Sequence, residues 1–305
     1  MLAYYFRSVK EETLQTGGGL RPGTWVHVED PAPSELDELA QSCGLNRDLL
    51  QDAVDFYEVP RYEYDEGVVY FFARFPCATD EASTAPILIA VSPTAVITVA
   101  RTHPDSFDSL LSGSTAVCTT QRTKLFLLLV GALNAGYRTK LVHIRRDVQR
   151  SRVHLRRIRT SDIVRLVGLE STLNDFISAL LPMHAALRAT LASKHLTLFD
   201  DDRDVIEDVE LENQQLTEAA KANLTTIQNI RSAYTAIMTN DLNAVMKLLT
   251  SLTIILIIPT IVGAFYGMNV PLPWSDSPHV FAGIVTTTLL LMAGAWYLFS
   301  RKNWL

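Results

Sequence analysis

Residues 248–269 read LLTSLTIILIIPTIVGAFYGMN, an uncharged apolar run that ends in Tyr266-Gly267-Met268-Asn269. A second uncharged run extends from Val280 to Phe299. Each run has roughly the ~20 apolar residues that a helix needs to cross the hydrocarbon core of a bilayer. Two buried core helices of a soluble protein are the alternative, but adjacent uncharged runs of this length favour the membrane. The sequence therefore predicts two C-terminal transmembrane helices, at 248–266 and 280–299.

The positions of basic residues predict how these helices are oriented. The connecting stretch, residues 267–279, carries no Lys or Arg, whereas Lys247 precedes the first span and Arg301 and Lys302 follow the second. Basic residues near span ends favour the cytoplasmic side. We therefore expect a multi-pass protein of the inner (plasma) membrane with an external loop at 267–279. Both termini, including a basic tail at 300–305, would be cytoplasmic.

The composition excludes several classes of protein. The 305 residues carry a net charge of -6, which gives no electrostatic support for binding nucleic acid. Cys43, Cys77 and Cys118 form no CxxC pair, so neither a disulfide nor a cysteine zinc site is expected. The chain has no GxGxxG, GxxxxGK[ST], HExxH or GxSxG motif and its seven histidines are scattered, so an enzyme and an organic cofactor have little support.

Residues 1–118 are expected to form an α/β cytoplasmic domain, so the whole chain would be α+β followed by long helices. Alternating residues predict a strand at 24–28, and strand-like runs predict strands at 68–75, 87–91 and 95–100, the last three as a meander. Ser34 is expected to cap a helix that Gly44 ends, and Asn46 to start a second helix. Residues 104–112 would add another.

Beyond residue 119 the apolar residues recur at steps of three and four, which is the helical period. This pattern predicts helices at about 120–159 and 162–195, as an antiparallel hairpin within 119–201. A third helix would begin at about Asp202, after an acidic capping run, and continue as a stalk into the membrane over 202–266. It would be about 60 residues or roughly 90 Å long, at 1.5 Å per residue. Its thin apolar stripe, which includes Leu211 and Leu216, suggests packing on one side only.

One face of the predicted first span differs from ordinary lipid-facing sequence. Small, hydroxyl and apolar residues alternate along it at steps of three and four: Asn243, Met246, Thr250, Thr253, Ile257, Thr260 and Ala264. Such residues also gather where membrane helices pack, so this periodicity alone fits helix packing and pore lining equally. Because two spans cannot enclose a pore, the protein is either a membrane-anchored signalling or scaffold protein or an assembly of several copies.

The motif Tyr266-Gly267-Met268-Asn269, at the outer end of the first of two C-terminal spans, resembles the signature of the CorA family of divalent metal ion transporters, also called the GMN family. Residues 243–247 resemble the family's motif where the pore helix enters the membrane, and residues 301–305 resemble its basic tail. Weaker similarity covers Trp25–Val28, Leu50–Val54 and Pro60–Glu63, so the resemblance extends over most of the chain and is strong at the C-terminus.

This resemblance implies a homopentamer with a cytoplasmic funnel and an axial pore lined by the first span. Asn269 from each subunit would form a ring of amide oxygens at the outer mouth, where oxygens can accept hydrogen bonds from the water that Mg²⁺ retains. Gly267 would allow a sharp turn and Met268 would pack the loop. Further in, Met246, Leu249 and Ile257 would form an apolar gate that closes by dewetting, with polar positions at Asn243 and Thr260.

The resemblance also implies that Mg²⁺ is sensed in the cytoplasm by carboxylates of neighbouring subunits. Asp208 on the long helix and Asp52 of the N-terminal domain match the family's positions, and carboxylate oxygens suit Mg²⁺. Gln51 stands where an acidic residue often accompanies Asp52, which would weaken the site. The alternative is two solvated surface carboxylates.

Two departures from the family pattern leave the transported ion open. Only Asp276 follows the GMN motif as an acidic group, and residues 143–159 are strongly basic where the family is often acidic. The zinc-transporting branch of the family, thought to be proton-coupled, also differs there. The expected partners are therefore membrane lipid, further copies of the chain and a divalent ion, Mg²⁺ first, with Zn²⁺, Co²⁺ or Ni²⁺ as alternatives.

Overall fold

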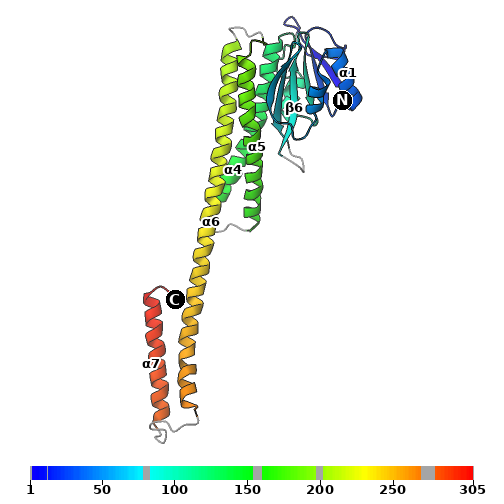
Figure 1. The fold of residues 1–305 in the computed structure, drawn as a ribbon. Helices are drawn as coiled ribbons and strands as arrows, with labels where there is room; N and C mark the ends of the chain where they lie inside the picture. Colours follow the sequence, from blue (N-terminus) through cyan, green and yellow to red (C-terminus); the bar gives the residue numbers. More distant parts are fainter. Residues whose placement is uncertain are drawn as a thin grey trace. The chain divides into compact units, whose positions relative to one another are not determined.

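The computed structural model describes residues 2–11, 13–77, 83–153, 160–196, 202–268 and 279–304, and it divides into two compact units (Figure 1). Unit 1 comprises residues 1–230 and unit 2 comprises residues 231–305. Helix α6 contributes its first part to unit 1 and its second part to unit 2. The two units are described separately below.

Within the described residues of unit 1, seven strands form one sheet in the order β2-β1-β3-β7-β6-β5-β4. The pairing of β3 with β7 is parallel and the other pairings are antiparallel. The predicted meander is therefore confirmed as β5-β6-β7, whereas β1, β2 and β4 were missed. The strands are β1 (Leu2–Phe6), β2 (Gln15–Thr16), β3 (Thr24–Glu29), β4 (Arg61–Asp65), β5 (Val68–Pro76), β6 (Thr84–Val91) and β7 (Ala95–Ala100).

Both faces of this sheet are covered by helices. Because successive side chains of each strand point to opposite faces, each strand contributes to two separate cores. On β5, Val68, Tyr70 and Phe72 pack under the two short helices α1 (Pro33–Cys43) and α2 (Arg47–Asp52). The alternate residues of β5, such as Phe71 and Phe75, pack under α4 (Arg122–Val153) on the other face. Near-continuous apolar strands are the expected result of two covered faces.

The end of the first short helix and the start of the second are as predicted, but the first begins differently and the second ends at Asp52, not at Val54. Gly44 ends α1 in the left-handed conformation, at φ 64°, and the Asn46 side chain caps α2 by accepting a hydrogen bond from the Asp48 backbone N–H at 3.0 Å. Ser34 is not the cap of α1, because the helix begins at Pro33. Proline suits the first helical turn, and the Glu35 carboxylate accepts the backbone N–H of Ala32 instead.

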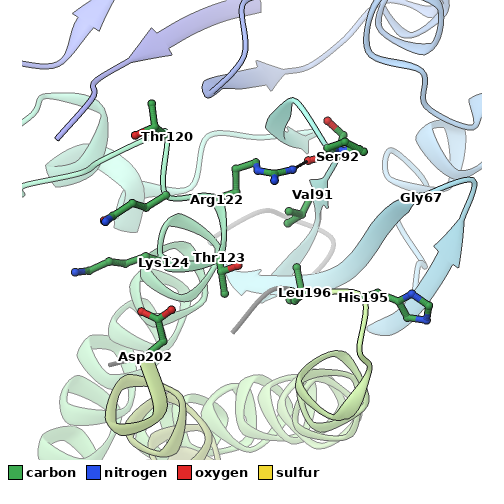
Figure 2. A pocket seen from close by; sticks show the side chains of 12 residues that line it. Gly67, Val91, Ser92, Thr120, Arg122, Thr123, Lys124, His195, Leu196 and Asp202 are labelled. Carbon is green, nitrogen blue, oxygen red and sulfur yellow. Dashed lines mark hydrogen bonds between the residues drawn. The ribbon is translucent and has the colours of Figure 1, made fainter. Parts of the chain in front are cut away.

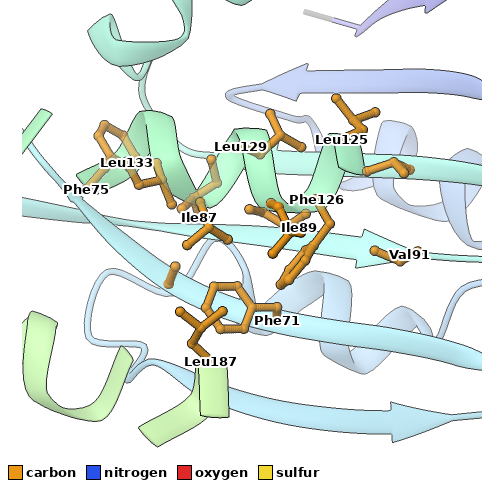
Figure 3. Close-up of a cluster of buried hydrophobic side chains, with 14 of the residues drawn as sticks. Phe71, Phe75, Ile87, Ile89, Val91, Leu125, Phe126, Leu129, Leu133 and Leu187 are labelled. Carbon is orange, nitrogen blue, oxygen red and sulfur yellow. The ribbon is translucent and has the colours of Figure 1, made fainter. Parts of the chain in front are cut away.

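The second face of the sheet holds the larger core, which Figure 3 shows. Phe126 and Leu129 of α4 lie on Phe71 and Ile89, and the rings of Phe71 and Phe126 meet edge to face at 5.3 Å. Each such buried side chain contributes about 1.5–3 kcal/mol of hydrophobic free energy. Helix α4 is apolar enough to resemble a membrane span, but half of that window is buried inside unit 1, which explains its composition.

The remaining elements of unit 1 complete this layer. The expected helix at 104–112 is present as a 3₁₀ turn η1 (Asp105–Phe107) and α3 (Asp108–Leu111). The three long helices are also confirmed in their described parts, as α4, α5 (Thr160–Ala192) and α6 (Arg203–Tyr266). Residues 154–159 and 197–201, where the first of these helices was expected to end and the third to be capped, lie outside the described residues.

A third core, apart from those on the two faces of the sheet, joins the three long helices of unit 1. Tyr137 of α4, Phe176 of α5 and Ile227 of α6 are buried at its centre, and the rings of Tyr137 and Phe176 meet edge to face at 5.1 Å. Leu216 of the expected α6 stripe is buried, but Leu211 is 52% exposed. The packed face of α6 instead includes the polar Asn213 and Thr217, which are both buried.

Unit 2 consists of the C-terminal part of α6 and α7 (Val280–Arg301). Three helices of the described chain are long and apolar enough to cross a membrane: α4, which packs on the sheet, and α6 and α7. The apolar windows of α6 and α7 are 11% and 0% buried, so nearly all of their apolar side chains are uncovered in a single chain. Lipid or further protein must cover them.

Candidate functional site

The apolar part of α6 has two different faces. Ser251 and Ile255 are 0% and 6% exposed, and Thr288 is the buried position of α7, so these residues mark where the described parts of α6 and α7 pack in unit 2. The predicted pathway residues Thr250, Thr253 and Ile257 are all exposed. Because a helix turns by about 100° per residue, the two faces are centred about 150° apart around the helix axis.

All of the predicted pathway residues are exposed in the single chain: Asn243, Met246, Leu249, Thr250, Thr253, Ile257, Thr260 and Ala264. Leu249 lies at the margin of the face, about 70° from its centre at 100° per residue. The hydroxyl groups of Thr253 and Thr260 donate to the backbone carbonyl oxygens of Leu249 and Leu256, one turn earlier. This bonding satisfies the hydroxyl hydrogen within the helix and leaves the oxygen lone pairs facing outward.

The start of the GMN motif lies at the end of α6. The Gly267 N–H donates to the carbonyl oxygen of Gly263 at 2.9 Å, and a Cβ on Gly267 would lie 3.2 Å from that same oxygen. Gly267 is not among the described residues with positive φ, so a left-handed turn does not require glycine at this position. Met268 is 52% exposed. Asn269 lies outside the described residues.

The predicted sensor residue Asp52 is the last residue of α2. Its Oδ2 accepts a hydrogen bond from Nη2 of Arg61 at 2.7 Å, and 44% of the Asp52 side chain is exposed. Arg61 also pairs with Glu58 and Glu63 and lies 4.0 Å over the Phe72 ring. Because the guanidinium has these other partners, Asp52 can turn toward a metal ion without leaving Arg61 unpaired.

Asp208, the second predicted sensor residue, is exposed on α6. The neighbouring Val209 packs in the core beneath α4, whereas Leu49 and Leu50 of α2 pack on the opposite face of the sheet. The sheet therefore separates the helices that carry Asp52 and Asp208. The two carboxylates are not brought together within one chain, and a shared metal site would need a second subunit.

A separate group of three residues meets in unit 1 without having been predicted. His27, Glu29 and His103 each offer one ligand atom, and these atoms lie within 4.8 Å of one another. Burial lowers the pKa of His27, against the opposing effect of its hydrogen bond with Glu29. The hydrogen bond with Glu29 raises the pKa of His103. Burial alone would raise the pKa of Glu29, but the hydrogen bonds with His103 and His27 outweigh it and lower the pKa.

Part of this group had a signal in the sequence. His27 and Glu29 are two residues apart in a predicted strand, which places both side chains on one face. Nothing local indicates His103, which is 74 residues from Glu29 and approaches it only because β3 pairs with β7. The scattered positions of the histidines along the sequence therefore gave no indication of this cluster.

A cavity of about 680 Å³ also lies in unit 1 (Figure 2). Its wall includes Arg122, Lys124, His195 and Asp202, and Arg122 donates a hydrogen bond to the carbonyl oxygen of Ser92. None of the described residues that line it belongs to the predicted pathway or sensor. Because the wall carries both basic and acidic groups, its charge selects no single class of ligand.

Comparison with known proteins decides the family. Residues 23–301 match the model of a family described as CorA-like Mg²⁺ transporter protein. The chain belongs to this family. Within it, the chain is 23% identical over 292 residues to the cobalt/magnesium transport protein CorA of Methanocaldococcus jannaschii, a match that covers 92% of this chain and 91% of that protein.

Solved structures show the same fold for this CorA-like protein. The complete structure of the CorA magnesium transporter from M. jannaschii matches 100% of this chain and 99% of its own, with a TM-score of 0.88 and 19% identity. The full-length CmaX protein matches 99% and 97%, with a TM-score of 0.76 and 17% identity. The ZntB cytoplasmic domain from Vibrio parahaemolyticus matches 78% and 98%, with a TM-score of 0.64 and 12% identity. The CorA-like fold expected from the sequence is thus confirmed.

Proposed function

We propose that this CorA-like protein transports hydrated divalent cations, Mg²⁺ first, through an axial pathway that α6 lines in a homopentamer. The observation that carries the proposal is the exposed face of α6, which runs from Asn243 to Ala264 and ends at the GMN motif. Helix α7 packs elsewhere on α6, at Ser251 and Ile255, so it leaves this face available to other subunits. A merely anchored protein needs no such face.

The outer selectivity site in this proposal is a ring of Asn269 side chains. Mg²⁺ dehydrates reluctantly and is usually bound with several waters still attached. Amide oxygens can accept hydrogen bonds from those waters without replacing them. The hydrogen bond from the Gly267 N–H to the Gly263 carbonyl oxygen supports this role, because it extends the helical bonding of α6 to within two residues of Asn269.

The proposed gate lies further along the same helix. Met246, Leu249 and Ile257 are between 48% and 58% exposed in the single chain and are available to form a narrow apolar section on the axis. A narrow apolar section blocks ions when it loses its water. Asn243 and Thr260 would offer polar groups on either side of it.

The proposed regulation uses the pair Asp52 and Asp208 from neighbouring subunits. The position of the sheet between α2 and α6 supports a bridge between subunits over one within a chain. Mg²⁺ bound between the two carboxylates would favour the closed state when the cytoplasmic concentration is high. In the membrane, the charge pattern supports an inner-membrane protein with both termini in the cytoplasm.

Zn²⁺ is the second candidate ion. In this alternative, its transport would be coupled to protons, as expected for the family's zinc branch. Two departures from the family pattern support it: Asp276 is the acidic group that follows the GMN motif, and residues 143–159 are strongly basic. The name of the M. jannaschii relative favours magnesium and cobalt.

Uptake into liposomes containing the purified full chain tests the proposal. We expect Mg²⁺ uptake that Asn269→Ala abolishes while the subunit number, measured by native mass spectrometry in detergent, stays at five. Uptake of Mg²⁺ and Zn²⁺ compared with and without an imposed pH gradient separates the two ions. A monomeric protein, or ion flux that is the same with and without the protein, would leave a membrane anchor as the function.

A further inference from the structure

The parallel pairing of β3 and β7 brings two histidines and a glutamate to one edge of the sheet. His27 is paired in register with Thr98, and Glu29 with Ala100, the last residue of β7. His103 follows three residues after that end. The carboxyl ends of parallel strands meet at the same edge, which is a common place for ligands in open sheets.

The ligand atoms of these three residues lie within 4.8 Å of one another. Glu29 Oε1 lies 2.8 Å from Nε2 of His27 and 2.5 Å from Nδ1 of His103. In a tetrahedral site with metal–nitrogen bonds of about 2.0–2.1 Å, neighbouring ligand atoms are about 3.4 Å apart. Opening the two hydrogen bonds by less than about 1 Å therefore gives the spacing that a metal ion needs.

Each histidine also has a partner on its other ring nitrogen. Nδ1 of His27 lies 2.7 Å from Oγ1 of Thr98, and this hydroxyl oxygen also accepts the indole N–H of Trp25 at 3.0 Å. Nε2 of His103 lies 2.7 Å from Oδ1 of Asp108. Metal-binding histidines almost always have such an outer partner, which holds the ring in the tautomer and orientation that bind the ion.

The surroundings differ on the two sides of the group. His27 is 3% exposed, and its ring lies 5.9 Å from Trp25 and 6.0 Å from the buried Phe107. His103 is 41% exposed and leaves the group open to water on its side. An ion can therefore enter from solvent and bind against an apolar wall.

We propose that His27, Glu29 and His103 bind a first-row transition-metal ion of the Zn²⁺ class in the N-terminal domain. Two imidazole nitrogens and one carboxylate suit Zn²⁺, whereas Mg²⁺ prefers a shell of oxygens. Three protein ligands leave a fourth position for water. The site shares no residue with the proposed pathway or sensor, so it stands whether or not the chain conducts ions.

Zn²⁺ binding to the full chain in detergent, measured by competition with a coloured chelator, tests this proposal. The variants are His103→Ala and Glu29→Gln, and the matched control is His143→Ala, an exposed histidine on α4. We expect the wild type and the control to bind one more Zn²⁺ per chain than either variant. Asp108→Asn should keep the site but weaken it by about tenfold or more, since it removes only the outer partner of His103.

Two further measurements distinguish a metal site from a purely structural hydrogen-bond network. Zn²⁺ should raise the unfolding temperature of the wild type and of His143→Ala but not of the two site variants, because only the folded site binds it. Co²⁺ should give the visible absorption of a tetrahedral complex in the wild type but not in His103→Ala or Glu29→Gln. An excess of Mg²⁺ should displace neither ion.

Several results would overturn the proposal. Equal Zn²⁺ stoichiometry and affinity in the wild type, His103→Ala and Glu29→Gln would show that the ion binds elsewhere. Displacement by Mg²⁺ at similar concentration would reject a transition-metal site. If either variant fails to fold without metal, as judged by circular dichroism, the comparison uses the other variant. Absence of Zn²⁺ binding to the wild type would by itself reject the site.

Discussion

Asn213 on α6 donates a hydrogen bond from its side-chain Nδ2 to Oδ1 of Asn134 on α4 at 3.3 Å, and both side chains are fully buried. Asn134 in turn donates to the carbonyl oxygen of Val209 at 3.1 Å. This pair of asparagines links α4 to α6 within unit 1. Because polar groups in a core must be paired, it also specifies one register between the two helices.

Replacing Asn134 by alanine is expected to lower the free energy of unfolding of unit 1. The substitution leaves the Asn213 amide buried without its side-chain partner and removes the additional hydrogen bond to the Val209 carbonyl oxygen, which costs about 1–3 kcal/mol. The unfolding midpoint in denaturant, followed by circular dichroism, measures this loss. Gln214→Ala, at an exposed position on α6 next to Asn213, should change stability by less than about 0.5 kcal/mol, and equal midpoints for the two variants would contradict the prediction.

Gly267→Ala is expected to reduce cation uptake while Gly263→Ala is not. The added Cβ at 267 would lie 3.2 Å from the Gly263 carbonyl oxygen, whereas a Cβ at 263 meets nothing within 4 Å outside the backbone of its own helix. Overpacking of this kind costs about 1–3 kcal/mol. Since 1.4 kcal/mol corresponds to about tenfold in binding, we expect about a tenfold loss of apparent Mg²⁺ affinity in liposome uptake. The same loss in both variants would reject the steric explanation.

Ile257→Ser is expected to weaken the proposed gate. A hydroxyl in the apolar section would retain water there, so uptake should persist at a high internal Mg²⁺ concentration that closes the wild type. The matched control is Leu256→Ser, one residue along and about 100° around the helix, where the side chain is 62% exposed. A leak of equal size in both variants would mean that the position on the helix face is irrelevant.

Asp208→Asn tests the proposed sensor. Loss of one carboxylate charge should raise the internal Mg²⁺ concentration that half-inhibits uptake, by about tenfold if the ion loses ~1.4 kcal/mol of binding energy. Asp204→Asn, at an exposed position one turn earlier on α6, should leave that concentration unchanged. An unchanged Mg²⁺ dependence in Asp208→Asn means that the carboxylate is only a solvated surface group.

Local patterns predicted most of the elements because they follow directly from the chain. Alternation marked β3, strand-like runs marked β5, β6 and β7, and the helical period marked the three long helices. Strands β1, β2 and β4 were missed because they are the shortest strands of the sheet, at five, two and five residues, and so give the least pattern. The predicted cap at Ser34 failed because Pro33, one residue earlier, already suits the first turn of a helix.

The sequence by itself determined the two apolar spans, the GMN motif after the first and the periodic stripe of small, hydroxyl and apolar residues along 243–264. Each is a property of neighbouring residues on one helix, and hydropathy and periodicity are local. Only the tertiary structure decided that β3 lies beside β7, that the sheet separates Asp52 from Asp208, and that His103 meets His27 and Glu29. Contacts between residues more than 70 positions apart depend on how strands pair, and pairing is set by burying both faces of the sheet at once.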